Sequence, residues 1–494
     1  MEALDWLVIG VFFLALIGII VWVVRQKQND SADYFLGGRD ATWLAIGASI
    51  FASNIGSEHL IGLAGAGASS GMAMAHWEIQ GWMILILGWV FVPFYSRSMV
   101  YTMPEFLERR YNPQSRTILS VISLVSYVLT KVAVTVYAGG LVFQQVFGIK
   151  ELWGIDFFWI AAIGLVVLTA LYTIFGGMKS VLYTSVLQTP ILLLGSLIIL
   201  VLGFKELGGW DEMMRVCGAV TVNDYGDTMT NLIRSNDDAN FPWLGALIGS
   251  AIIGFWYWCT DQFIVQRVLS GKNEKEARRG TIFGAYLKLL PVFLFLIPGM
   301  IAFALHQKYI GAGGEGFLPM LANGTANADA AFPTLVAKLL PAGVKGLVVC
   351  GILAALMSSL ASLFNSSAML FTIDFYKRFR PETPEKKLVG IGQIATVVIV
   401  ILGILWIPIM RSVGDVLYTY LQDVQSVLAP GIAAAFLLGI CWKRTSAQGG
   451  MWGLIAGMII GLTRLGAKVY YSNAGEVADS TFKYLFYDMN WLFF

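Results

Sequence analysis

The residues best suited to chemistry lie in an apolar stretch that is unusually rich in glycine. Between Phe51 and Gly71 the sequence places Asn54, Glu58 and His59 among small residues. A hydrocarbon environment tolerates polar side chains and irregular backbone only where protein buries them or where they line a cavity. We therefore expect a broken membrane span that binds a ligand there. A polar cluster that only joins neighbouring helices would use the same residue types.

Aromatic residues lie in the middle of a later apolar stretch, where Tyr257 and Trp258 are adjacent. Flat rings stack on the apolar C–H face of a sugar, whereas amide, carboxylate and ammonium groups bind its hydroxyls. Lys288 could complete such a set, although it could also extend its ammonium group to the membrane interface. Asp261 and Arg267, which follow the aromatic residues, are expected to be charges at that interface. The combined residue types favour a neutral polyol as ligand.

A third group consists of the hydroxyls of Ser358 and Ser359 in a long apolar stretch. Small hard cations such as sodium require several oxygen ligands. Backbone carbonyls released by an unwound helix, together with two hydroxyls, would supply them without a charged side chain. The alternative is that both serines bond to their own helix or to a neighbouring one.

The elements that position these residues must be membrane spans. The chain has 494 residues, of which 57% are hydrophobic and 13% charged, and its mean hydropathy is +0.71. A soluble domain carries roughly twice that share of charge. We predict an all-α polytopic membrane protein without a sizeable soluble domain. The sequence has no nucleotide-binding loop, no nucleophile motif and only three histidines, so it indicates neither an ATP-driven pump nor an enzyme. Its scattered basic residues do not favour nucleic acid.

We expect about thirteen spans of bilayer length. Their predicted centres lie near residues 15, 55, 86, 130, 163, 192, 256, 292, 354, 398, 430 and 458, with an incomplete last one near 488.

Basic residues cluster in alternate loops, which predicts the topology. The clusters lie at 97–116, 272–279, 377–387 and 443–444, whereas the long polar segments 205–240 and 307–334 fall on the other side. The positive-inside rule makes the basic loops cytoplasmic and places the N-terminus outside, at the cell membrane. Arg25 follows the first apolar stretch instead of preceding it, so we interpret that stretch as a retained span and not as a signal peptide.

The glycine-rich second span has a counterpart in the segment 249–262, which also carries polar residues at membrane depth. The two segments begin five-span blocks, 44–203 and 241–441, whose first helices run in opposite directions. Two inverted five-helix repeats with broken first helices are typical of the leucine-transporter fold. An extra N-terminal helix at 5–26 and C-terminal spans at 447–494 complete one transporter domain.

Several blocks in order resemble the sodium/solute symporter family, and within it the sodium/glucose cotransporter branch. These blocks are 33–39, Gly47–Ser57, Gly88–Pro93, Trp256–Gln262, Ile264–Arg267, Leu356–Ser359, Phe364–Ser366 with Asp374, and Trp442–Arg444.

The resemblance implies a sugar site between the two repeats and a sodium ion as the coupling partner. The residues implied to hydrogen-bond the sugar are Asn54, His59, Glu78, Trp258, Lys288 and Gln422. Tyr257 would stack beneath the sugar as part of the inner gate. The outer gate would use Leu63, Trp77 and Tyr418. The sodium ion would bind the carbonyls of Ala52, Ile55 and Ala355 and the hydroxyls of Ser358 and Ser359.

Three positions depart from the family pattern. Ser185 stands where members often have an aspartate tied to cation coupling, Thr135 stands where sugar transporters can have aspartate, and Gly254 replaces a hydroxyl residue. The first departure argues for one sodium per sugar or for altered coupling. The expected function is sodium-coupled symport of a neutral monosaccharide of the glucose or galactose type by alternating access. Alternatives are another substrate, such as myo-inositol or an organic acid, and a sugar sensor that does not accumulate sugar.

Overall fold

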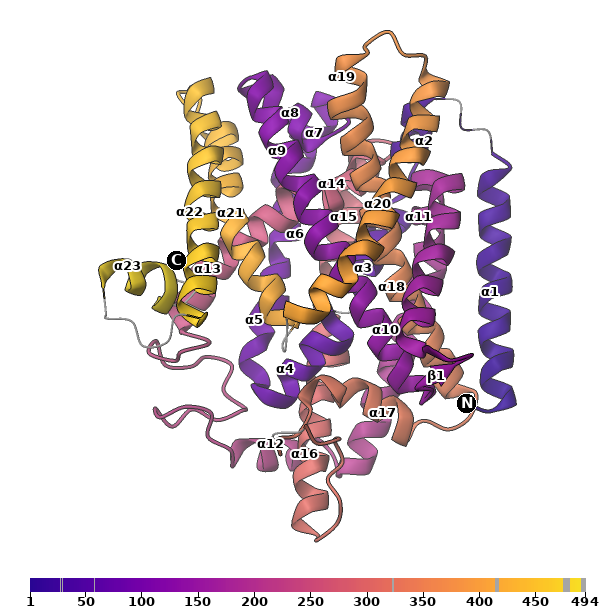
Figure 1. The fold of residues 1–494 in the computed structure, drawn as a ribbon, viewed down its shortest axis with the longest axis vertical. Coiled ribbons are helices and arrows are strands. Elements are labelled where there is room, and N and C mark those ends of the chain that lie inside the picture. The colour runs from indigo at the N-terminus through magenta and orange to yellow at the C-terminus, as the bar shows by residue number, and fades with distance from the viewer. Residues whose placement is uncertain are drawn as a thin grey trace.

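The computed structural model describes residues 1–26, 28, 30–56, 58–321, 324–413, 417–473 and 480–489. In this part the chain is a bundle of helices with one small antiparallel hairpin, formed by β1 (Glu151–Leu152) and β2 (Ile155–Asp156) (Figure 1). Eight helices of the described part are long and apolar enough to cross a membrane. The prediction of a polytopic helical membrane protein is confirmed.

The α-helices are α1 (Ala3–Val24), α2 (Ser31–Leu36), α3 (Trp43–Asn54), α4 (Ala64–Ser69), α5 (His76–Ile79), α6 (Met83–Ile86), α7 (Val92–Ser98), α8 (Met103–Arg110), α9 (Pro113–Ser126), α10 (Ala133–Phe147), α11 (Phe157–Leu207), α12 (Trp210–Gly218), α13 (Trp243–Phe255), α14 (Gln262–Leu269), α15 (Glu274–Leu287), α16 (Ile297–Gly311), α17 (Ala331–Leu339), α18 (Val344–Met369), α19 (Lys377–Phe379), α20 (Glu385–Val413), α21 (Leu417–Cys441), α22 (Ala447–Asn473) and α23 (Thr481–Lys483). The π-helical turns are η2 (Glu58–Leu63), η5 (Leu87–Phe91), η6 (Tyr127–Val132), η7 (Trp256–Thr260), η8 (Val292–Leu296), η10 (Leu370–Tyr376) and η11 (Tyr484–Asp488), and the 3-10 turns are η1 (Gly37–Arg39), η3 (Gly71–Ala75), η4 (Gln80–Trp82) and η9 (Ala328–Ala330).

The predicted span centres fall in helical segments, except for residue 55, where the helix is interrupted. The centres near 163 and 192 both lie in α11, which changes direction at Gly177 (φ 52°, ψ −148°). Glycine adopts this backbone conformation without steric cost, and a side chain at Gly177 would collide with the backbone of Tyr34. The element α11 thus consists of two helices that meet at Gly177, one for each predicted span. The incomplete last span stays a prediction, because 474–479 and 490–494 are outside the described residues.

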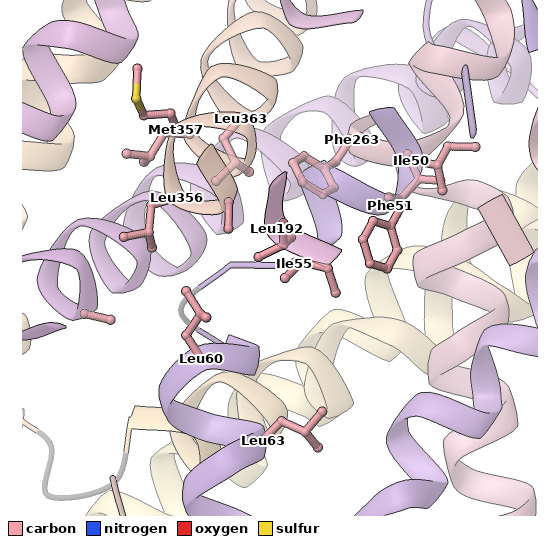
Figure 2. Packing of buried hydrophobic residues seen from close by; sticks show 14 of the residues in the cluster. Ile50, Phe51, Ile55, Leu60, Leu63, Leu192, Phe263, Leu356, Met357 and Leu363 are labelled. Carbon is pink, nitrogen blue, oxygen red and sulfur yellow. The ribbon is translucent and has the colours of Figure 1, made fainter. Parts of the chain in front are cut away.

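Both glycine-containing polar spans are broken. Helix α3 ends at Asn54 because Ile55 is extended (φ −79°, ψ 105°), and the chain resumes as η2 and α4. The seventh span runs through α13 and η7 and is broken at Asp261 (φ −75°, ψ 129°), before α14. Figure 2 shows Ile55, where α3 ends, and Leu60 of η2 near buried residues of α18. The breaks leave backbone carbonyls without helical partners inside the bundle.

Small residues hold the second span against α15. A Cβ atom at Gly47 would lie 2.5 Å from Phe283 Cδ1, and one at Gly280 would lie 2.8 Å from the carbonyl oxygen of Trp43. Such close approach of two backbones inside a membrane is characteristic of small residues at helix contacts. The contact fixes the end of α15, and therefore Lys288, relative to the break after α3.

The basic loops gather at one end of the bundle. The guanidinium group of Arg110 donates to the carbonyl oxygens of Gly439 and Trp442, and Arg116 pairs with Asp374 at 2.6 Å. Lys377 pairs with Glu385 at 2.9 Å. In Figure 1, α8 and α19 lie at this end, whereas the N-terminus, α12 and α16 lie at the opposite end. This arrangement agrees with the predicted alternation of the loops.

Candidate functional site

The broken spans, α5 and the end of α15 surround one cavity. Its volume is about 40 Å³, which is enough for water molecules but smaller than the roughly 300–1,000 Å³ of a typical small-ligand site. The predicted site residues that line it are Asn54, His59, Trp77, Glu78, Tyr257, Trp258 and Lys288. Residues far apart in sequence thus meet at one place, as a binding site requires.

A compact group of charges forms one wall of this cavity. The Nζ atom of Lys288 lies 2.6 Å from Glu78 Oε2 and 2.8 Å from His59 Nε2, and Glu78 Oε1 lies 3.2 Å from the same His59 nitrogen. All three side chains are buried. The ammonium group donates to Glu78, while His59 Nε2 either accepts from Lys288 or donates to Glu78, depending on which ring nitrogen carries the proton. The wall then carries no net charge.

Several polar atoms of the cavity wall have no partner. Asn54 Oδ1, His59 Nδ1 and Gln80 Oε1 are buried and make no hydrogen bond within the described part of the chain. A buried polar atom without a partner costs about 1–3 kcal/mol. The cavity therefore offers the acceptors Asn54 Oδ1 and Gln80 Oε1, together with a ring nitrogen of His59, to a ligand that carries several hydroxyl groups.

Two glycines make room for this arrangement. A Cβ atom at Gly81 would lie 2.6 Å from Lys288 Cγ, and one at Gly254 would lie 2.7 Å from Gln80 Oε1. The absence of a side chain at Gly254 thus makes room for the amide of Gln80. Sequence reasoning missed Gln80 because the glycine that accommodates it lies in another span.

Tyr257 connects the two broken spans beneath the charged wall. Asn54 Nδ2 donates to the Tyr257 hydroxyl at 3.0 Å. The Tyr257 ring packs edge-on against Trp258 with ring centroids 4.9 Å apart, and Lys288 Nζ stands 5.6 Å from the centroid of the Trp258 ring. Release of Tyr257 would require the Asn54 bond to break, which is the property expected of a gate residue.

A second group of buried charges lies behind Tyr257, where the sequence predicts interfacial charges. Asp261 accepts from Lys131 Nζ at 2.7 Å and from the Tyr127 hydroxyl. Asp261 and Arg267 are only 4% and 1% exposed, so their prediction as interfacial charges is wrong. The physical reason is the break at Asp261, which directs the charged end of the span into the bundle. Lys131 was missed because nothing in its own span indicates a partner in α14.

The predicted sodium ligands lie where α18 passes the end of α3. Ser359 Oγ donates to the carbonyl oxygen of Ser53 at 2.5 Å, and Ser358 Oγ lies 3.2 Å from Ser185 Oγ. A Cβ atom at Gly56 would lie 3.0 Å from Ser359 Oγ. Hydroxyls and released carbonyls are neutral oxygen donors, which fits the preference of sodium for oxygen ligands.

Arg267 lies against the same serine cluster. Its Nε and Nη2 atoms donate to Ser53 Oγ at 3.0 and 2.6 Å, and Nε also approaches Ser49 Oγ at 3.1 Å. Ser185 Oγ lies 3.4 Å from Ser49 Oγ. The hydroxyl of Ser185, where the resemblance implies an aspartate in other members, thus lies two hydrogen-bond steps from a buried cation.

The remaining predicted residues have different outcomes. The carbonyls predicted to bind sodium belong to the buried residues Ala52, Ile55 and Ala355, which lie at the break and on α18. Leu63 is buried in η2 and is not a cavity-lining residue of the described chain. The side chains of Tyr418 and Gln422 are outside the described residues. Gln425, three positions after Gln422, does line the cavity.

Comparisons with known proteins show the family of this chain. Residues 34–457 match the sodium:solute symporter family. The human sodium/myo-inositol cotransporter 2 is 38% identical over 479 residues, which cover 94% of this chain and 70% of that protein. The rat sodium/glucose cotransporter 2 is 38% identical over 512 residues, covering 99% of this chain and 75% of that protein.

Solved structures show the fold. A Na+-coupled sialic acid symporter in a substrate-bound outward-open state has a TM-score of 0.77 at 21% identity, covering 100% of this chain and 96% of the other. MhsT in complex with L-phenylalanine has a TM-score of 0.54 at 11% identity, covering 86% of this chain and 98% of the other. The predicted leucine-transporter-like fold is confirmed.

The family and the relatives are sodium-coupled transporters and not enzymes. The match extends through both broken spans and the cavity between them. The chain is therefore an integral membrane transporter, and it belongs to the sodium:solute symporter family.

Proposed function

We propose that this chain carries a neutral monosaccharide of the glucose or galactose type across the cell membrane together with sodium, by alternating access. The observation that carries the proposal is the set of unpartnered polar atoms on Asn54, His59 and Gln80 around a wall without net charge. Hydroxyl groups both donate and accept, so one polyol satisfies all of them. An organic anion would require an excess of positive charge in the cavity. Here the carboxylate of Glu78 neutralises the charge of Lys288.

We infer that the sugar binds the polar atoms of Asn54, His59, Glu78, Trp258, Lys288 and Gln422 and stacks on Tyr257. Trp77, Leu63 and Tyr418 form the outer gate. These roles rest on the cavity for the residues that line it, and on the family resemblance for Leu63, Tyr418 and Gln422.

We assign the sodium ion to the carbonyls of Ala52, Ile55 and Ala355 and the hydroxyls of Ser358 and Ser359. Sodium there would hold the break after α3 against α18, which keeps Asn54 and His59 in the cavity wall. Binding of sodium to the sugar-competent state in preference to the others is what couples the two fluxes. Each sodium also gains about 2.3 kcal/mol per 100 mV of membrane potential.

One sodium per sugar fits the serine cluster best. Ser185 supplies no carboxylate, and the guanidinium group of Arg267 bonds to Ser49 and Ser53 nearby. A second cation at Ser185 would lie close to this positive charge and would gain only a neutral hydroxyl from Ser185. The basic end of the bundle is taken as cytoplasmic, which places the N-terminus outside.

A second candidate substrate is myo-inositol, because several relatives at 37–39% identity carry that name. Like a pyranose, it presents hydroxyls around a six-membered ring, so the same cavity chemistry applies.

Competition separates the candidate substrates. Uptake of radiolabelled glucose into proteoliposomes under a sodium gradient is measured with excess unlabelled galactose, myo-inositol or an organic acid. Glucose uptake that galactose inhibits and the organic acid does not would support the proposal. Sodium-driven uptake of labelled myo-inositol without glucose uptake would show that myo-inositol is the substrate instead. Inhibition by the organic acid alone would overturn the neutral substrate.

A further inference from the structure

A second hollow, distinct from the substrate cavity, lies on the outside of the bundle between α9 and α20. It has a volume of about 590 Å³, and its surface is formed entirely by apolar atoms. Phe371 of η10 lines it, as do Leu124 of α9 and Val398 of α20. We call this hollow the α9–α20 groove.

The α20 side of the groove follows a single helical stripe. Ile391, Ile394, Val398 and Leu402 recur at intervals of three and four residues, which places them on one face of the helix. Ile394, Val398 and Leu402 are 61%, 48% and 47% exposed. In a membrane protein, such a face at span depth meets lipid chains.

The groove has the depth of one leaflet. From Ile391 to Leu402, α20 rises by roughly 16 Å at 1.5 Å per residue. Half of a typical hydrocarbon core is about 15 Å. A single phospholipid of one leaflet would therefore fill the groove with its acyl chain and keep its headgroup at one end.

Basic residues stand at the end where that headgroup would lie. Lys387 is one helical turn before Ile391 on the same face of α20. Arg378 donates to Thr117 Oγ1 at 2.6 Å and to the Pro113 carbonyl oxygen at 3.3 Å. Thr117 lies on the face of α9 that continues to Leu124. The groove-lining faces of α9 and α20 therefore each end near a basic residue, Arg378 and Lys387 respectively.

These two cations are not neutralised by the protein. Within the described residues neither Arg378 nor Lys387 has a carboxylate within ion-pair distance, whereas the neighbouring Lys377 pairs with Glu385 at 2.9 Å. The segment 377–387 carries five basic and two acidic residues. Basic clusters next to membrane spans attract anionic lipid headgroups.

We propose that the α9–α20 groove binds an anionic glycerophospholipid, with one acyl chain along α20 and the phosphate group between Arg378 and Lys387. The lipid would bridge α9 and α20 on the surface of the bundle. This site does not depend on which sugar the transporter carries.

Native mass spectrometry of the purified full chain tests this proposal. The protein is titrated with phosphatidylglycerol and, separately, with phosphatidylcholine of the same acyl chains. Wild type should bind phosphatidylglycerol more tightly. The double variant Arg378→Gln/Lys387→Gln should weaken this binding roughly 30-fold, at about fivefold per removed charge, and Val398→Trp should weaken binding of both lipids by filling the groove.

The matched control is Lys443→Gln/Arg444→Gln, which removes the same charge from another basic loop. This control should retain phosphatidylglycerol binding. Equal affinity of wild type for both lipids, or an equal loss in the control, would overturn the proposed site. The charge variants change exposed side chains and should keep the wild-type melting temperature, so the test stands even if Val398→Trp fails to fold.

Discussion

Lys288 and Lys131 are both buried lysines paired with a carboxylate, yet they serve two different regions. Lys288 borders the cavity and stands over Trp258, whereas Lys131 is absent from the described cavity lining and stands 4.6 Å from the centroid of the Tyr257 ring. Water and ligand can reach the first pair, while only protein surrounds the second. This difference is the basis for proposing Lys288 as a sugar-binding group and Lys131 as a group that holds Tyr257, the proposed inner gate, in place.

The largest expected effect concerns the pair of Lys131 and Asp261, which lies outside the described cavity lining. Asp261→Ala leaves the Lys131 ammonium group buried without a partner, which should destabilise the protein by about 3–5 kcal/mol. Glu78→Ala should cost less, because cavity water can solvate Lys288. Thermal unfolding in detergent compares the two variants. Equal losses of stability in Asp261→Ala and Glu78→Ala would show that the two lysine pairs do not differ in their access to water.

A double variant sharpens this test. In Lys131→Met/Asp261→Leu both charges are replaced by apolar groups of similar size, which often restores stability. We expect the double variant to regain most of the lost stability. A double variant as unstable as Asp261→Ala would show that the pair itself is not the cause.

The next effect concerns the cavity pair. Glu78→Gln keeps the shape of the side chain and removes its charge, so it should weaken charge-assisted bonds of about 1.5–3 kcal/mol. The sugar concentration for half-maximal uptake should rise roughly 10- to 150-fold. Glu58→Gln, which changes another cavity carboxylate, is the matched control and should have a smaller effect. A larger rise in the half-maximal sugar concentration for Glu58→Gln than for Glu78→Gln would show that Glu78 does not bind the sugar.

A smaller effect is expected at the sodium site. Ser359→Ala removes one proposed ligand and should raise the sodium concentration required for uptake by about fivefold, at roughly 1 kcal/mol per hydroxyl interaction. Ser362→Ala is the control, since Ser362 bonds to Ser53 Oγ and to the Ser358 carbonyl oxygen but is not a proposed ligand. An unchanged sodium requirement in Ser359→Ala would show that sodium does not bind at the proposed site.

The smallest effect concerns Gly254. A serine there would press on the Gln80 amide and should change the glucose-to-myo-inositol uptake ratio by a few fold, at about 1 kcal/mol for one displaced hydrogen bond. Gly164→Ala, where a Cβ atom meets nothing within 4 Å, should leave the ratio unchanged. A wild-type ratio in Gly254→Ser would exclude Gln80 from substrate selection.

The sequence predicted the broken spans because an unbroken, lipid-facing helix rarely carries glycine and polar residues together at membrane depth. It could not predict the pairing of Lys131 with Asp261, which depends on how α14 turns after the break. Asp261 and Arg267 look like interfacial charges as long as the span is treated as straight. Gln80 was not predicted for a similar reason, because its amide occupies space that is free only because Gly254 has no side chain. Properties within one span were predictable from the residues alone, and the meeting of Asn54, Trp258 and Lys288 was implied only by the family resemblance. Contacts that the resemblance did not imply, such as that of Lys131 with Asp261, were not predicted.

The central claim is sodium-coupled accumulation of a neutral sugar, and uptake of radiolabelled glucose and galactose into proteoliposomes tests it most directly. The account predicts accumulation above the external concentration under an inward sodium gradient, and none when potassium replaces sodium. Equal uptake under both gradients, or no uptake of either sugar while sodium still binds, would contradict it.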